Sequence, residues 1–475
     1  RVHRQEVNRP GRSRGSRCAQ SNATREEIYA AVVSDAADDH AGTADDDAAK
    51  SVGQVRRPGY QPGDLVRVTI GNVAHGGHCV ARDGNLVIFV RHALPGEDVT
   101  VRITQTARSY ARAEVIDVHE AHPGRIRPPC PAFGPGGCGG CDFLHATSGV
   151  QRGLKLQVLR EALERHGGLP PTAVEELTRE GIIDLGAATG WRTRMRYRTT
   201  TVDVHGEVHG VPALRAYRSD DVVDASSCVI ADATGHVQAR ERAANIRVPG
   251  DLFMVRDSVE SRVMFQPDEG PGDDQPSLRH QLRVGENLLQ FHAPIDGFWQ
   301  VHPELIGRIV DTVLAWGAPE AGERWWDLYA GVGPIAAALA DRVGPSGHVV
   351  AVESSPIAAD EARRVLETAY GRDVVAVQQH DVRRWIRKAR DEGARADGVV
   401  LDPPRTGAGK AVIEALGAIR PGRIVVVACD PVALGRDIQL LAVQGYRLAG
   451  IRAWDAFPQT HHLESIAHFL PDQIS

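Results

Sequence analysis

Residues 325–339 carry the pattern that most restricts the fold of this chain: an apolar strand, a tight glycine turn and a helix. Gly331 and Gly333 allow a sharp turn, and Pro334 suits a first helical turn, where its missing N–H costs nothing. Throughout the C-terminal part of the chain, apolar strands alternate with amphipathic helices. This alternation is typical of a doubly wound sheet, so we predict an α/β domain over residues 291–475.

A ligand site is predicted at the same turn. Glu353 lies 20 residues after Gly333 and directly follows the apolar run His348–Val352. A carboxylate at this place can accept hydrogen bonds from both hydroxyls of a ribose. A dinucleotide-binding Rossmann site is a rival interpretation, but its third glycine would fall at Ala336. On this pattern alone, an ordinary strand-to-helix turn without a ligand stays open.

Two further predicted strands end in residues that carry chemistry. Asp402 opens the sequence Asp-Pro-Pro, and Cys429 follows the next strand, Arg423–Ala428. Ligands bind at the carboxyl ends of strands in open α/β sheets, so we expect both residues on the rim of the cofactor site. Asp-Pro-Pro resembles the substrate-side motif of S-adenosylmethionine-dependent methyltransferases. A lone cysteine is more often a small core residue, but the position of Cys429 on the rim favours a reactive thiol.

A thiol at this place suits the methylation of a pyrimidine carbon. C5 of uracil is a poor nucleophile until another nucleophile, such as a thiolate, adds at C6. The C5 proton must leave afterwards, which requires a general base. Glu464, close to the C-terminal end of the sequence, is the best candidate for that base, and a plain surface glutamate is the alternative.

The N-terminal part of the chain has a different pattern. Residues 1–57 are first Arg-rich and then acidic, and such blocks of like charge are typical of disorder. Short alternating segments with glycine and proline turns follow over residues 58–119, which predicts a small β-barrel of the oligonucleotide-binding kind. The barrel resembles a TRAM domain, an RNA-binding module, although a small barrel of another function is an alternative. The resemblance rests on Gly76-Gly77, Leu94–Glu97 and Tyr110–Ala113.

The charge balance argues against a uniformly basic nucleic-acid binder. Lys and Arg number 55 against 61 Asp and Glu, a net charge of −6. RNA binding must then rest on local arginines. Four of them alternate along one predicted strand, where they would share one face and follow phosphates, unless the strand is a solvated edge. They are Arg192, Arg194, Arg196 and Arg198.

Cysteines gather in the central region, residues 120–290, which we expect to be an α+β domain. Three of the seven cysteines have the spacing C-x7-C-x2-C, with glycines between them that let the backbone wrap around a compact group. Cys228 can complete four thiolates, which by ligand count suit zinc or an iron–sulfur cluster equally. Free structural cysteines are the alternative. The clustered three are Cys130, Cys138 and Cys141. No role is assigned to Cys18 and Cys79.

Taken together, these features resemble the RNA 5-methyluridine (uracil-C5) methyltransferase family over about residues 59–475. Besides the barrel and the cysteines, the shared motifs are Phe298–Val301, Asp327–Gly333, Asp402–Arg405, Ala428–Pro431 and His462–Ser465. The resemblance implies that Cys429 is the nucleophile, Glu464 the base, and [4Fe-4S] rather than zinc the group on the four cysteines. Arg405 is expected to contact RNA. The residues expected to bind S-adenosylmethionine are Gln300, Tyr329, Gly331, Gly333, Glu353, Asp381 and Asp402.

Two positions depart from the pattern that this family commonly has. Asp430 stands where the family commonly has Asn, and His302 stands where it often has Asn, so contacts to uracil or cofactor are expected to differ there. We expect a methyl group to pass from S-adenosylmethionine to C5 of a uridine flipped out of structured rRNA or tRNA. The rivals are an inactive RNA-binding or redox-sensing protein on the same fold, and a nicotinamide-dependent oxidoreductase.

The expected location is the cytoplasm. The sequence contains no run of about 18 apolar residues and no apolar core of a signal peptide. Neither a membrane nor an obligate protein partner is expected.

Overall fold

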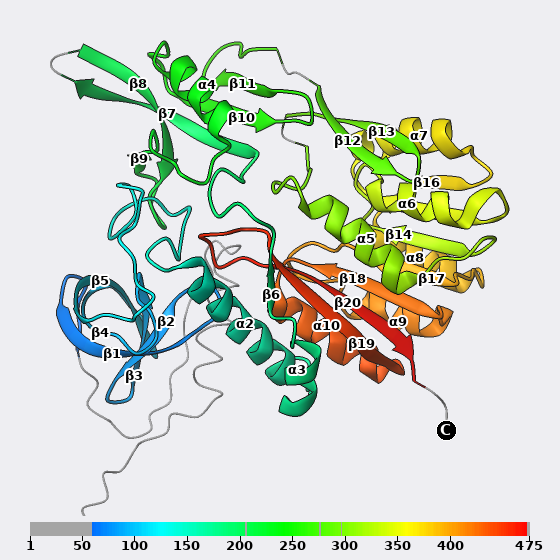
Figure 1. Ribbon diagram of the computed structural model, residues 1–475, viewed down its shortest axis with the longest axis horizontal. Coiled ribbons are helices and arrows are strands. Elements are labelled where there is room, and N and C mark those ends of the chain that lie inside the picture. Colours follow the sequence, from blue (N-terminus) through cyan, green and yellow to red (C-terminus); the bar gives the residue numbers. More distant parts are fainter. Residues whose placement is uncertain (1–58, 205–206, 275–276, 296, 473–475) are drawn as a thin grey trace, which may run out of the picture.

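The computed structural model describes residues 59–204, 207–274, 277–295 and 297–472. They form a small barrel, a central antiparallel sheet and a large α/β part (Figure 1). The predicted N-terminal segment 1–57 lies outside the described residues. Among the helices described, none combines the length and the apolar character that crossing a bilayer requires.

Five N-terminal strands close into the predicted barrel, in the order β1-β2-β3-β5-β4. Because β1 pairs with both β2 and β4, no strand of the barrel has an unpaired edge. Cys79 is fully buried in the barrel, and its thiol donates to the carbonyl oxygen of Ala93 at 3.3 Å. Cys79 is therefore a core residue. The strands are β1 (Leu65–Val73), β2 (Cys79–Asp83), β3 (Leu86–Arg91), β4 (Asp98–Thr106) and β5 (Tyr110–Glu120).

The central sheet has five antiparallel strands in the order β11-β10-β7-β8-β9, with helix α4 packed against it. A hairpin of β12 and β13 leads from this sheet to the α/β part and packs against helices of that part. The elements are β7 (Arg194–Val204), β8 (Glu207–Arg215), β9 (Val222–Asp224), α4 (Ala233–Ala243), β10 (Gly250–Arg256), β11 (Ser261–Pro267), β12 (Leu278–Val284) and β13 (Asn287–Ala293).

The α/β part is built on an eight-stranded sheet in the order β16-β15-β14-β17-β18-β20-β19-β6. Its strands are β6 (Ile182–Asp184), β14 (Arg324–Leu328), β15 (His348–Glu353), β16 (Val375–Gln379), β17 (Gly398–Leu401), β18 (Arg423–Ala428), β19 (Tyr446–Asp455) and β20 (Glu464–Pro471). Its helices are α5 (Leu305–Gly317), α6 (Pro334–Val343), α7 (Pro356–Tyr370), α8 (Val382–Asp391), α9 (Lys410–Ile419) and α10 (Pro431–Val443), with a 3₁₀ turn η1 (Gly344–Ser346).

Helices cover both faces of this sheet, as a doubly wound fold requires. Trp325 and Trp326 are neighbours on β14, and they point into two different cores because successive strand residues face opposite ways. Helices α5, α6 and α7 contribute to the first core, and α8, α9 and α10 to the second. The predicted α/β fold of the C-terminal part is confirmed.

Some residues before the predicted domain boundary at residue 291 pack with the α/β part. Helix α2 (Ser148–Arg165) and helix α3 (Pro171–Leu177) come from the predicted central region, yet α2 packs against α10 of the α/β part. The short strand β6 (Ile182–Asp184) then extends the large sheet, parallel to β19. Residues 148–184 therefore belong physically to the α/β part, because their apolar side chains are buried in its second core.

Candidate active site

Four parallel strands of the large sheet end at one rim, and predicted site residues follow each of them. Strands β15, β14, β17 and β18 are paired in parallel, so their carboxyl ends coincide. Tyr329, Glu353, Asp402 and Cys429 lie at or directly after these ends. The strand order reverses between β14 and β17, and ligands bind at such a switch point in open α/β sheets.

The glycine turn after β14 holds one carboxylate in place. Its backbone is left-handed at Tyr329 (φ 66°), Gly331 (φ 56°) and Gly333 (φ 90°). The N–H of Gly331 donates to Oε2 of Glu353 at 2.9 Å, and the N–H of Ser355 donates to Oε1 at 2.6 Å. A Cβ at Gly333 would lie 2.8 Å from a leucine side chain of α7, so only glycine allows this approach. The left-handed Tyr329 costs about 1–3 kcal/mol, which is typical of functional sites.

Buried carboxyl groups gather at the rim beside this turn. Burial raises the pKa of Asp327 to about 7, and the charges of Asp402 and Glu353 add to the rise. Burial also raises the pKa of Asp402 to about 7. Oδ2 of Asp327 accepts the N–H of Ala336 at 2.8 Å, but Oδ1 has no hydrogen-bond partner among the described residues. These buried carboxyl groups therefore suit a cationic ligand. Asp327 was not predicted as a site residue, and its only sequence signal is that it opens the glycine motif.

Strand pairing brings the predicted nucleophile and base together. Strands β18 and β20 are antiparallel with Ala428 opposite Ser465, and the Ser465 hydroxyl donates to the Ala428 carbonyl at 2.8 Å. Cys429 directly follows Ala428 and Glu464 directly precedes Ser465, so both lie beside this last pair of the register. Burial raises the pKa of the Cys429 thiol to about 12, and the charge of Glu464 contributes next, while Arg405 opposes the rise.

The pKa of Glu464 is also shifted far from its ordinary value. Its side chain is buried, and burial raises its pKa well above the usual value, with a further contribution from Asp402. The cation of Arg405 opposes this rise as well. The rim thus holds a thiol and a carboxyl whose pKa values are both raised by burial. A bound positive charge would favour the ionised form of both groups.

The segment that precedes Glu464 is fastened to the cysteine region and to α2. The backbone N–H groups of Asp142 and Phe143 both donate to the carbonyl of Gln459, at 2.8 and 2.9 Å. Oδ2 of Asp142 accepts the backbone N–H of His461 at 3.0 Å and lies 2.7 Å from its Nδ1. The loop that carries Cys141 therefore helps to place the candidate base.

A buried ion pair completes this attachment, and its loss should destabilise the protein. Nζ of Lys155 in α2 donates to Oδ1 of Asp455 at 2.6 Å, and both side chains are almost inaccessible. Lys155→Met leaves the Asp455 charge buried without its partner. We expect it to lower the free energy of unfolding by about 3–5 kcal/mol in denaturant titrations. Lys410→Met, which breaks the exposed pair with Glu414, should cost less than about 1 kcal/mol. Equal losses would contradict this expectation.

Two predicted cofactor residues lie beyond the four-strand rim. Asp381 follows β16 and caps α8, where its Oδ1 accepts the N–H of Arg384 at 3.0 Å. Gln300 lies between β13 and α5, in a segment whose Val301 carbonyl accepts both the N–H and the hydroxyl of Thr193, at 3.0 and 2.8 Å. Phe298 of this segment is 71% exposed.

His302, one of the two departures from the family pattern, is a buried structural residue. Its ring stacks on Trp191 with 6.3 Å between ring centroids, and its Nδ1 accepts the N–H of Glu304 at 3.3 Å. Burial lowers the pKa of His302.

The predicted arginine stripe differs from expectation because its strand arginines have partners within the protein. Arg194 donates to the carbonyl of Gly297, and Arg196 and Arg198 both pair with Asp251 on the neighbouring strand β10. Arg198 also pairs with an aspartate after β11. Arg192 lies before β7, close enough to the central cysteines for their charges to affect its pKa. Aspartates remote in sequence thus partner Arg196 and Arg198, whereas Arg405 is exposed beside Cys429 and Glu464.

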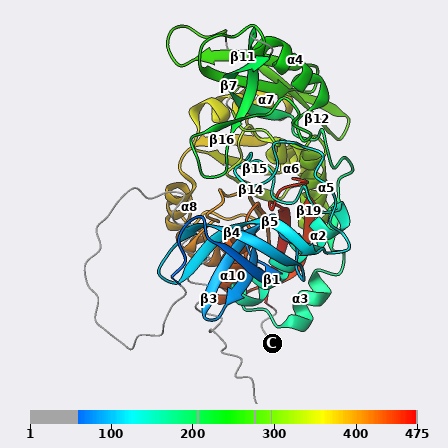
Figure 2. The same cartoon turned by 90° about the vertical axis from the view of Figure 1, so that its left-hand side faces the viewer.

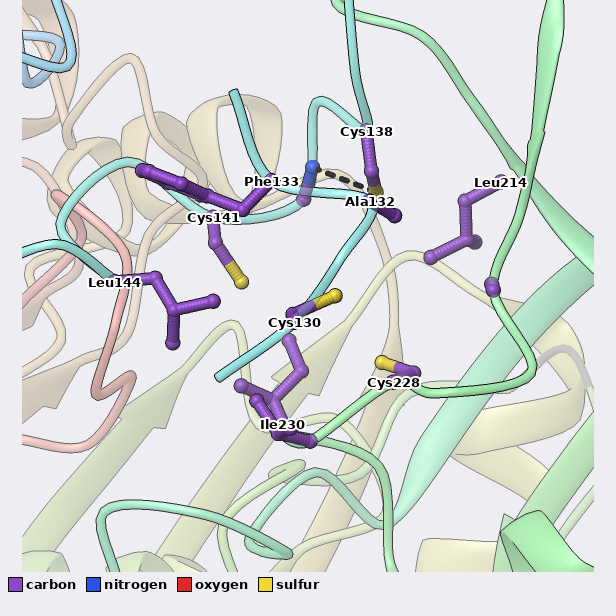
Figure 3. Close-up of a pocket in the computed structure, with 12 residues that line it drawn as sticks. Cys130, Ala132, Phe133, Cys138, Cys141, Leu144, Leu214, Cys228 and Ile230 are labelled. Carbon is purple, nitrogen blue, oxygen red and sulfur yellow. Dashed lines mark hydrogen bonds between the residues drawn. The ribbon is translucent and has the colours of Figure 1, made fainter. Parts of the chain in front are cut away.

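The four central cysteines line one small, mainly apolar cavity (Figure 3). The N–H of Gly140 donates to the sulfur of Cys138 at 3.3 Å. Burial raises the pKa of Cys138, Cys141 and Cys228, and the charges of neighbouring thiols add to each rise. Among the described residues, no three Cys, His, Asp or Glu side chains are arranged to hold a metal ion.

One contact beside the candidate nucleophile, Cys429, had no signal in the sequence. His75 lies on the turn between β1 and β2 of the barrel, and its Nε2 is 2.9 Å from Oδ2 of Asp430. The two residues are 355 positions apart, so no local pattern could have joined them.

The strand order and the acidic rim together define a class I methyltransferase fold. In agreement, the chain superposes on the tRNA (uracil-54, C5)-methyltransferase of Pyrococcus abyssi, solved with S-adenosyl-L-homocysteine, with a TM-score of 0.61. The two sequences are 20% identical, and the match covers 85% of this chain and 99% of the other. At that identity the likeness concerns the fold.

Sequence comparisons then identify the family. Residues 60–116 match the TRAM domain, and residues 273–470 match the tRNA (Uracil-5-)-methyltransferase family. An "Uncharacterized RNA methyltransferase" of Streptomyces avermitilis is 36% identical over 442 residues, 86% of this chain and 99% of the relative. The 23S rRNA (uracil(1939)-C(5))-methyltransferase RlmD of Chromohalobacter salexigens is 33% identical, covering 84% and 88%. The chain belongs to the family of S-adenosylmethionine-dependent RNA uracil-C5 methyltransferases with a TRAM domain.

Proposed function

We propose that this enzyme methylates C5 of a uridine in ribosomal RNA through a covalent intermediate on Cys429. The observation that supports the mechanism is the β18–β20 pairing, which ends at Ala428 and Ser465, the neighbours of Cys429 and Glu464, so that the charge of Glu464 acts on the thiol. The thiolate of Cys429 adds to C6 of the uracil, and C5 then takes the methyl group. Glu464 removes the C5 proton, and the C5–C6 double bond re-forms as the thiolate leaves.

S-adenosylmethionine supplies an electrophilic methyl group, and the acidic pocket suits its positive charges. The unpartnered Oδ1 of Asp327 and the raised pKa of Asp402 are what a cation would satisfy. We assign Glu353 to the ribose hydroxyls, because Gly331 and Ser355 hold its oxygens at the glycine turn. The further residues proposed for this pocket are Gln300, Tyr329, Gly333 and Asp381.

A groove beside the barrel offers a path for the RNA. It has a volume of about 820 Å³ and lies between β1, β2 and helix α2. Both views of the molecule place the barrel next to α2 and α10 (Figures 1 and 2). The groove also reaches His75 and Val432, beside the nucleophile. Its walls carry the arginines Arg67, Arg82, Arg160 and Arg165. Glu161 and Glu164 lie in the same walls, so the groove is mixed in charge. Its arginines can nevertheless contact phosphates, and exposed Arg405 lies beside Cys429 and Glu464.

Ribosomal RNA is favoured because relatives at 28–33% identity over most of both chains carry the name 23S rRNA methyltransferase. Mass spectrometry of 5-methyluridine in RNA from cells with and without the gene tests the substrate. We expect one site of 23S rRNA to lose its methyl group in the absence of the gene, and purified enzyme to restore it. Loss of the methyl group from transfer RNA alone would contradict this assignment.

We further propose that Cys130, Cys138, Cys141 and Cys228 hold an iron–sulfur cluster. In a [4Fe-4S] cluster each thiolate binds its own iron, whereas one zinc ion draws its ligands around a single centre. The four thiols that line one cavity match the number of ligands that such a cluster takes, and this number supports the proposal. Methyl transfer is redox-neutral, so the cluster would fasten the Cys141 loop, and with it the segment before Glu464.

Protein purified without oxygen should then contain about four iron and four sulfide per chain and absorb broadly in the visible region. Cys228→Ser should lose most of the iron, because it removes one of four ligands. Cys79→Ala should keep it, since Cys79 lies in the barrel core. Stoichiometric zinc without iron would refute the cluster.

A further inference from the structure

The barrel reaches directly into the loop that carries the candidate nucleophile. His75 and Asp430 meet at 2.9 Å with side chains 23% and 21% exposed, so water only partly screens the contact. Asp430 is the residue immediately after Cys429. Asp430 therefore connects a residue of the barrel, His75, to the residue that carries the reacting sulfur.

Asp430 is held from two sides. Its Oδ1 accepts the N–H of Ala433 at 2.8 Å and caps α10, while its Oδ2 faces His75. Burial raises the pKa of Asp430, but the hydrogen bond and the charge of His75, together with the helix cap, bring it below the ordinary value. The carboxylate is therefore ionised at neutral pH.

An ionised carboxylate beside Cys429 opposes the chemistry that the thiol must perform. Asp430 is one of the negative groups that raise the pKa of Cys429, and a thiol reacts only after it has lost its proton. The imidazole of His75 binds the oxygen of Asp430 that the helix cap leaves free. It can offset part of that negative charge and fix the direction in which the carboxylate points.

We propose that His75 is a positioning residue for methyl transfer: it holds and partly neutralises Asp430, and so makes the barrel a part of the catalytic centre. The proposal rests on Cys429 being the nucleophile, as proposed above. RNA that binds to the barrel then contacts the loop of Cys429 and Asp430, which the barrel itself holds in position.

The test is the rate at which the enzyme forms a covalent adduct with 5-fluorouridine RNA, with S-adenosylmethionine present and RNA saturating. His75→Ala should slow this rate about tenfold, because one unit in the thiol pKa changes the thiolate fraction tenfold. Asp430→Asn removes the charge and keeps a capping oxygen. The double variant His75→Ala/Asp430→Asn should therefore return to within about twofold of Asp430→Asn alone.

A matched control and two opposing outcomes make the test decisive. His119→Ala, in the same barrel, removes the contacts to Thr100 and Asp117 and should leave the rate unchanged. If His75→Ala raises only the KM for RNA, or if Asp430→Asn fails to rescue it, His75 merely fastens the barrel and the proposal is wrong. An adduct that survives Cys429→Ala would instead refute the proposed function. Loss of the adduct in Cys429→Ala with a normal rate in His75→Ala would refute only the role of His75.

Discussion

Cys429→Ala is expected to abolish the covalent adduct with 5-fluorouridine RNA and to lower methyl transfer by about 10⁴-fold or more. The variant removes the only group on the rim that we assign to C6, and without an adduct C5 stays a poor nucleophile. The small alanine side chain leaves the β18–β20 pairing intact, since Ala428 and Ser465 make the contacts that fix it. Denaturing gels measure the adduct, and transfer of a labelled methyl group measures turnover.

Cys79→Ala serves as the control for this variant. It also removes a buried thiol, but in the barrel, so adduct and turnover should stay close to wild type. An adduct of normal yield in Cys429→Ala would show that another residue attacks C6. If the wild-type protein itself forms no adduct and transfers no methyl group, the alternative of an inactive RNA-binding or redox-sensing protein is favoured.

Glu464→Gln should stop the reaction one step later. The nucleophile is retained, so C6 attack and methyl transfer proceed, but no base removes the C5 proton. We expect a covalent complex to accumulate even with ordinary uridine RNA, and turnover to fall by about 10²–10⁴-fold. Glutamine keeps the shape of the buried side chain and removes the negative charge that raises the pKa of Cys429, so adduct formation itself should not be slowed.

The same gel and transfer assays follow this variant, with Glu414→Gln on the exposed surface of α9 as the control. The control should behave as wild type. Normal turnover in Glu464→Gln would exclude Glu464 as the base. A variant that neither turns over nor forms the methylated complex would mean that Glu464 acts before methyl transfer, for example on the cofactor pocket.

The sequence predicted the parts of the site that depend on local structure. Strand, glycine turn and helix are encoded within residues 325–339, and the chemistry of Asp402 and Cys429 follows from their places after apolar strands. The closed barrel also followed from alternation and turn residues alone. These features are predictable because the period of apolar residues and the torsional freedom of glycine act over a few neighbours.

Tertiary structure decided the contacts between distant segments. Only the fold shows that Asp251 partners Arg196 and Arg198, which turns a predicted basic stripe into ion pairs. Only the fold brings β6 into the large sheet and pairs Ala428 with Ser465, the neighbours of Cys429 and Glu464.

By itself, then, the sequence determined the type of each element and the residues able to do chemistry, while the fold determined which of them meet. The clearest case is His75 and Asp430, 355 residues apart, which share no local pattern. Charge pairing and strand order depend on what the rest of the chain places nearby, and burial, together with neighbouring carboxylates, raises the pKa of Cys429 and of Glu464.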